Sequence, residues 1–83
     1  MTQKILSPES LGAALRKERK KKGLSQTTVG KSVGIDQPTM TRVEKGNPGT
    51  ELGTVFRLLA ALDLELVIQS RQRSTDDTKG DIW

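Results

Sequence analysis

Residues 24–46 contain two short helical patterns joined at a single glycine, and this arrangement constrains the fold more than any other part of the chain. Ser25 is a favoured N-cap, because its hydroxyl can accept from the unpaired N–H groups that open a helix. Val29 and Val33 follow on one face, one turn apart. A first helix is therefore predicted over residues 26–33.

A second helix is predicted after a tight turn at Gly34, which can adopt the left-handed conformation that ends a helix. Asp36 caps this helix, and Pro38 lies in its first turn, where the missing N–H is not needed. Gly46 ends it. Ile35 is the apolar residue of the turn, and Met40 and Val43 form the buried face of this second helix. Two short helices about a tight turn form a helix-turn-helix, which predicts that the chain binds DNA.

Four polar residues of the second helix are predicted to face outward and contact bases: Gln37, Thr39, Thr41 and Arg42. The major groove admits a helix and presents a distinct pattern of donors and acceptors for each base pair. Gln37 is the best candidate, because its amide can pair with both polar groups of adenine. Arg42 is predicted to contact either a guanine or a phosphate.

Contacts with DNA phosphates are predicted for four further residues: Gln26, Thr27, Lys31 and Lys45. Side chains and the positive end of the helix over residues 26–33 would meet the sugar-phosphate backbone there and set the register on the duplex. Gln26 and Gln37 could instead be ordinary exposed residues that do not contact DNA. The basic run at residues 16–22 could likewise be either a phosphate contact or a solvated helix end.

One helix is predicted before this motif and another after it. The first begins at Ser7, with Pro8 at the first helical position, and ends at Gly23. The later helix is capped by Thr50, and a separate short helix over residues 52–54 is an alternative. The buried residues predicted for these helices are Leu11, Ala14 and Leu15 in the first, and Leu52, Val55, Phe56, Leu59 and Leu62 in the later one.

Beyond the last helix the apolar pattern changes to an alternation typical of a β-strand, predicted over residues 63–69. Leu64, Leu66 and Ile68 share one face of this strand. A single strand is not stable alone, and nothing else in the chain has a strand pattern, so the strand is predicted to pair with its copy in a second subunit. A homodimer would place two recognition helices about 34 Å apart on a palindromic site.

Composition supports a DNA-binding protein and argues against an enzyme. The 83 residues carry a net charge of +4, and the segment from residue 70 onward has three basic and three acidic residues, so the excess charge lies in residues 1–69. The chain contains no cysteine, histidine or tyrosine, so neither a metal site nor a cofactor is expected. A small enzyme is a remote alternative, because no nucleophile and base occur at a recognisable spacing.

The apolar segments are too short for a membrane protein. The longest run, residues 58–62, is far below the length of a membrane-spanning helix, and the first ten residues lack the apolar core of a signal peptide. The sequence therefore predicts a cytoplasmic protein, and the predicted DNA binding would associate it with the nucleoid.

The motif residues resemble the Cro/C1-type (XRE) helix-turn-helix family of phage and bacterial repressors, over roughly residues 10–62. The resemblance rests on Arg19 and on residues 23–26, 34–35 and 41–46. It implies an all-α, lambda-repressor-like bundle with a structural ion pair between Arg19 and Glu44. Asp36 and Pro38 depart from the pattern at the start of the recognition helix, so no relative's operator sequence carries over.

The order of parts is similar to that of HipB-type antitoxins: an arm at residues 1–6, a five-helix-like DNA-binding domain at 7–62, a dimerisation strand at 63–69 and a disordered tail at 70–83. The resemblance implies a repressor of its own operon that also restrains a HipA-like serine/threonine kinase toxin. Trp83, at the end of the tail, would dock on that partner. A stand-alone phage-type or restriction-control repressor without a toxin partner is the alternative.

Overall fold

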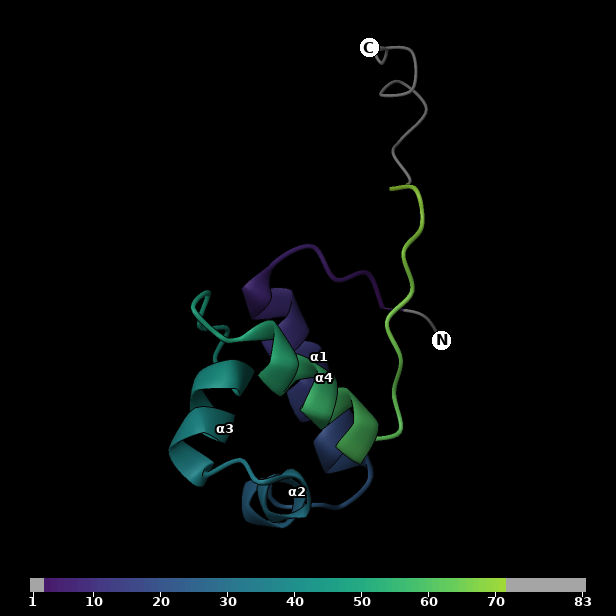
Figure 1. The fold of residues 1–83 in the computed structure, drawn as a ribbon. Coiled ribbons are helices and arrows are strands. Elements are labelled where there is room, and N and C mark those ends of the chain that lie inside the picture. The colour runs from purple at the N-terminus through teal and green to yellow at the C-terminus, as the bar shows by residue number, and fades with distance from the viewer. Residues whose placement is uncertain (1–2, 72–83) are drawn as a thin grey trace, which may run out of the picture.

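Four helices form the fold in a computed structural model that describes residues 3–71 (Figure 1). In chain order these helices are α1 (Pro8–Lys21), α2 (Gln26–Val33), α3 (Gln37–Glu44) and α4 (Leu52–Ala61). Helix α1 packs against α3, and α2 packs against both α3 and α4. The predicted all-α bundle is confirmed, with four helices in place of five among the described residues.

Local sequence signals explain where the first three helices begin. The Ser7 hydroxyl accepts from the backbone N–H of Ser10 at 3.0 Å, and the Ser10 hydroxyl accepts from the Ser7 N–H at the same distance. This reciprocal pair closes the start of α1. Ser25 caps α2 by accepting from the Thr28 N–H at 3.0 Å. These caps satisfy donors that have no partner within their own helices.

The turn between α2 and α3 depends on a glycine with left-handed backbone geometry. Gly34 has φ 71°, and the next residue, Ile35, donates its N–H to the Gly30 carbonyl at 2.8 Å. A residue with a Cβ would be strained at position 34. Asp36 then caps α3 by accepting from the Thr39 N–H at 2.9 Å. The predicted turn and the bounds of α2 are confirmed.

The core lies where the four helices meet. Its fully buried apolar side chains are Leu15, Val29, Ile35, Met40, Val43, Val55, Leu58, Leu59 and Leu62. Aliphatic side chains of this size supply most of the folding energy in a domain with little aromatic content, at about 1.5–3 kcal/mol for each one buried. Leu11 and Val33 are partly buried against this core.

Two predictions about α4 are wrong. The Thr50 hydroxyl donates to the Asn47 carbonyl at 2.9 Å, and the N-cap position belongs to Glu51, which makes no side-chain cap bond. Leu52 and Phe56 remain 66% and 51% exposed. The inward stripe of α4 instead follows Val55, Leu58, Leu59 and Leu62, so Leu52 and Phe56 form a separate stripe on a neighbouring face. The alternative of a separate helix over residues 52–54 is also wrong, because α4 is continuous.

The predicted C-terminal strand does not form within one chain. Residues 64–71 leave the end of α4 without regular secondary structure, and residues 3–71 contain no strand (Figure 1). Leu64 packs partly against the core, whereas Ile68 is 99% exposed. Strand pairing requires a second strand, so pairing between two subunits stays a prediction. Most of the predicted tail, including Trp83, lies outside the described residues.

Candidate nucleic-acid interface

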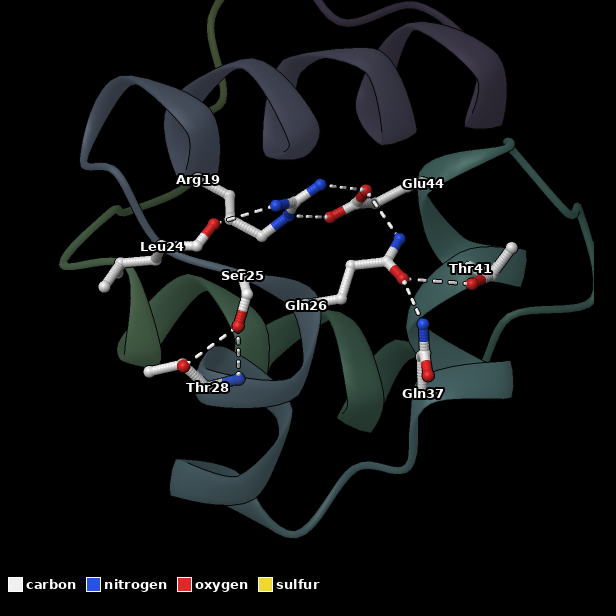
Figure 2. A network of polar contacts seen from close by, with 8 residues as sticks. All are labelled: Arg19, Leu24, Ser25, Gln26, Thr28, Gln37, Thr41 and Glu44. Carbon is white, nitrogen blue, oxygen red and sulfur yellow. Dashed lines mark hydrogen bonds and ion pairs between the residues drawn. The ribbon is translucent and has the colours of Figure 1, made fainter.

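A buried ion pair fixes the C-terminal ends of α1 and α3 to each other. Arg19 donates from Nε to Glu44 Oε2 at 2.7 Å and from Nη2 to Glu44 Oε1 at 3.0 Å (Figure 2). Its third nitrogen, Nη1, donates to the Leu24 carbonyl at 2.8 Å. These are the two side chains that the Cro/C1-type resemblance pairs. The planar fork of the guanidinium holds α3 at a defined angle against α1.

The charges of this pair stabilise each other despite their burial. Burial disfavours the charged carboxylate of Glu44, but hydrogen bonds from Arg19 and Gln26, with the positive charges of Arg19 and Arg16, hold its pKa below the ordinary value. The hydrogen bond to Glu44 raises the pKa of Arg19. Both groups are therefore ionised at neutral pH, as a buried pair must be to satisfy its donors and acceptors.

Gln26, at the start of α2, links the ion pair to the exposed side of α3. Its Nε2 donates to Glu44 Oε1 at 3.0 Å, and its Oε1 accepts from the Thr41 hydroxyl at 3.2 Å. The same oxygen accepts from Gln37 Nε2 at 3.5 Å, so Gln26 lies between Glu44 and Gln37 (Figure 2). Both ends of the Gln26 amide are thus engaged within the protein. This half-buried side chain positions Gln37 and Thr41.

The exposed side of α3 carries most of the predicted base-contacting residues. Gln37 and Arg42 are exposed, while Thr39 and Thr41 are half-buried at the margins of this surface. Arg42 donates from Nη2 to the Thr39 hydroxyl at 3.2 Å. Pro38 is exposed too, and helical geometry places it between Gln37 and Arg42 on the outward side. Pro38 was predicted from sequence to start the helix and to depart from the Cro/C1-type pattern, and its helical position already placed it on this face.

The remaining predicted phosphate contacts are solvent-exposed. Thr27 and Lys31 are one turn apart on α2, on the side opposite the buried Val29. Lys45 follows the last residue of α3 and is also exposed. The structure thus leaves these three side chains free to approach DNA, whereas Gln26 is held in the internal network.

Other kinds of site find little support in the part of the chain that the structure describes. Between residues 3 and 71 there is no cluster of three or more potential metal-ligating side chains. None of the four helices combines the length and hydropathy needed to cross a membrane.

Comparison with known proteins places the chain in a family. Residues 10–67 match a family described as a helix-turn-helix domain. Antitoxin HipB of Escherichia coli strain K12 is 30% identical over 76 residues, which cover 92% of this chain and 86% of that protein. The chain belongs to the HipB antitoxin family. HipB of Escherichia coli O6:H1 is 35% identical over 66 residues, covering 80% of this chain and 70% of that relative.

Solved HipB structures share the fold. A HipB–O4 20mer complex matches with a TM-score of 0.81 and 32% identity, covering 86% of this chain and 100% of that one. A HipA–HipB–O2–O3 complex matches with a TM-score of 0.79 and 35% identity over the same shares of the two chains. The HipB-type helix-turn-helix prediction is confirmed. A member of this family is a DNA-binding regulator and not an enzyme.

Proposed function

We propose that this protein is a sequence-specific transcriptional repressor whose helix α3 enters the major groove of operator DNA. The observation that carries the proposal is the exposed polar side of α3, which the buried Arg19–Glu44 pair and Gln26 hold in one orientation. A rigid helix face is suited to reading bases, because few side chains lose freedom on binding. The likeness to the HipB–O4 20mer complex supports this assignment.

Within this proposal, base contacts come from α3, and phosphate contacts come from α2 and from the residue that follows α3. The base-reading residues are Gln37, Thr39, Thr41 and Arg42. The phosphate-contacting residues are Thr27, Lys31 and Lys45, together with Gln26, whose amide nitrogen keeps one N–H beyond the one donated to Glu44. The net charge of +4 supports association with a polyanion, so binding weakens steeply as salt concentration rises. Gln26 has a second role, because its amide orients Gln37.

The repressor acts as a homodimer that pairs two copies of the segment at residues 63–69. Leu66 and Ile68 are exposed in the single chain, as are Leu52 and Phe56 on α4. Such side chains gain favourable burial when a second copy covers them. A two-fold dimer would present its two α3 helices to a palindromic operator.

The protein is also the antitoxin of a HipA-like serine/threonine kinase and represses its own operon. Support comes from membership of the HipB family and from the likeness to the HipA–HipB–O2–O3 complex. Trp83 is the proposed docking residue, at the end of a tail spanning residues 70–83. The other proposed parts are the arm at residues 1–6 and the DNA-binding domain at residues 7–62.

DNA selection tests the repressor function. The full-length protein is incubated with a pool of randomised duplexes, and the bound fraction is amplified and sequenced. A palindromic consensus, bound in preference to a scrambled duplex, is the expected result. Binding without sequence preference would contradict the assignment of α3 as a base reader.

Co-purification tests the antitoxin function separately. The chain is tagged at its N-terminus and expressed with the neighbouring gene products of its own operon, in full-length form and truncated after Gln69. Full-length protein is expected to retain a HipA-like kinase, and truncation to weaken the complex. DNA binding without any kinase partner would favour the alternative of a stand-alone repressor.

A further inference from the structure

Asp36 places a carboxylate at the N-terminal end of α3, directly before the base-reading residues. Its Oδ1 accepts from the Thr39 N–H at 2.9 Å and so caps the helix. The side chain is exposed, and the only acid that forms an ion pair within residues 3–71 is Glu44. Arg42, whose positive charge acts on Asp36, donates to the Thr39 hydroxyl. A carboxylate has about four acceptor positions, and Thr39 occupies only part of them through its N–H and its hydroxyl. The Asp36 carboxylate therefore keeps acceptor capacity for a further donor.

This carboxylate remains charged beside the DNA. Hydrogen bonds from Thr39 and the positive charge of Arg42 hold the pKa of Asp36 below its ordinary value. A carboxylate accepts hydrogen bonds and cannot donate them, so it is repelled by phosphate oxygens and by acceptor groups on bases. An acid at the tip of a recognition helix consequently weakens binding unless a donor lies opposite.

The base edges of the major groove offer two amino donors, N4 of cytosine and N6 of adenine. Adenine also presents the N7 acceptor beside its amino group, which would repel the carboxylate. The amino group of adenine thus has an acceptor on each side, its own N7 and O4 of the paired thymine, whereas N4 of cytosine has one, O6 of the paired guanine. Cytosine is therefore the base that fits Asp36.

We propose that Asp36 is a specificity-determining residue that accepts from the N4 amino group of a cytosine, at the base pair beside the one contacted by Gln37. The inference rests on the proposed function, because it requires α3 to lie in the major groove. Asp36 favours the cognate site through this hydrogen bond and disfavours other DNA through repulsion. It accounts for an acidic residue at a surface whose other charged side chains, Arg42 and Lys45, are basic.

Asp36→Asn is the informative variant, since asparagine is as good an N-cap as aspartate but has no charge and carries an NH2 donor in place of one carboxylate oxygen. The control is Glu51→Gln, which removes a negative charge from the exposed N-cap of α4, where the side chain makes no cap hydrogen bond. Thermal unfolding of both variants should match the wild type, which separates an effect on DNA reading from an effect on folding.

Each protein is titrated against three duplexes: the consensus selected by the wild type, that consensus with the cytosine replaced, and a scrambled sequence. The wild type and Glu51→Gln should discriminate against the replaced base by about tenfold. Asp36→Asn should lose this discrimination and bind the scrambled duplex about two- to fivefold more tightly at low salt. Unchanged discrimination by Asp36→Asn would overturn the proposal, whatever happens on scrambled DNA. Failure of the wild type to select any consensus would instead refute the proposed repressor function.

Discussion

At the scale of single residues, Glu44 joins the core of the molecule to its candidate DNA surface. Its carboxylate accepts from Arg19 on α1 and from Gln26 on α2, while its own backbone ends α3. Removing one partner of such a buried pair leaves the other charge without compensation. Replacing Glu44 should therefore affect both the stability of the fold and the recognition of DNA.

Stability should depend on pH through Glu44. The lowered pKa means that its contribution is fully present above the ordinary value of 4.5 and is lost as pH falls through the folded-state value. At neutral pH, Glu44→Gln should lower the free energy of unfolding by about 3 kcal/mol. Urea unfolding of wild type and variant at several pH values should show this difference shrinking in acid. A difference independent of pH would contradict the account, and Glu51→Gln serves as a control for an exposed carboxylate.

Gln37 should contribute to sequence recognition without contributing to nonspecific affinity. Replacing Gln37 with alanine should cost about 1–3 kcal/mol on the selected duplex and little on scrambled DNA, because only a base contact distinguishes the two. Fluorescence anisotropy titrations would measure both affinities. Gln3→Ala, at an exposed glutamine before α1, should leave both unchanged. Equal losses on the two duplexes would remove Gln37 from base reading.

At the scale of secondary-structure elements, the close packing of α1 on α3 is as important as the caps. Gly12 is buried, and a Cβ at that position would meet the backbone carbonyl oxygens of Val43 and Glu44 at the end of α3. The absence of a side chain lets the two helices approach closely enough for the Arg19–Glu44 pair to form. Sequence periodicity does not reveal such an approach, because it depends on two segments distant in the chain.

Gly12→Ala should therefore destabilise the fold, although alanine favours a helix. The expected loss is about 1–3 kcal/mol from overpacking against backbone, measured by urea unfolding. Gly53→Ala is the matched control, because a Cβ at that helical position meets no atom within 4 Å. This control should leave stability unchanged or raise it by up to about 1 kcal/mol. A stabilised Gly12→Ala variant would show that the α1–α3 contact can relax.

At the scale of the whole molecule, exposed apolar side chains support the proposed homodimer. Phe56 is half-exposed, and Ile68 is almost wholly exposed. A chain this small buries a limited core, so covering these side chains in a dimer would add appreciable stability. Two copies would also supply two recognition helices for one operator.

Ile68→Thr should weaken the dimer while keeping the β-propensity of the segment. Loss of a buried isoleucine from each subunit, at about 1.5–3 kcal/mol per side chain, should raise the dimer dissociation constant by at least about tenfold. Gln69→Thr alters the opposite face of the predicted strand and should leave dimerisation unchanged. Sedimentation equilibrium would measure both. A monomeric wild type, or equal effects of the two variants, would contradict the proposed pairing.

The sequence by itself determined the helix-turn-helix of this protein. Ser25, Gly34 and Asp36 act through hydrogen bonds and backbone geometry within a few residues, so the bounds of α2 and the start of α3 were predictable. The tertiary structure alone decided how α4 is oriented. Leu52 and Phe56 lie on a helical face as apolar as its core face, and only packing against α2 and the rest of the core selects between the two.

The tertiary structure also decided the role of Gln26. On sequence it was predicted to contact a phosphate, but in the structure its amide lies between Glu44, Thr41 and Gln37. These partners are far from Gln26 in the chain and come within hydrogen-bonding distance only when α2 and α3 are folded together. Local signals fix caps and turns because their partners are neighbours in sequence. Networks between helices depend on distances that only the folded chain defines.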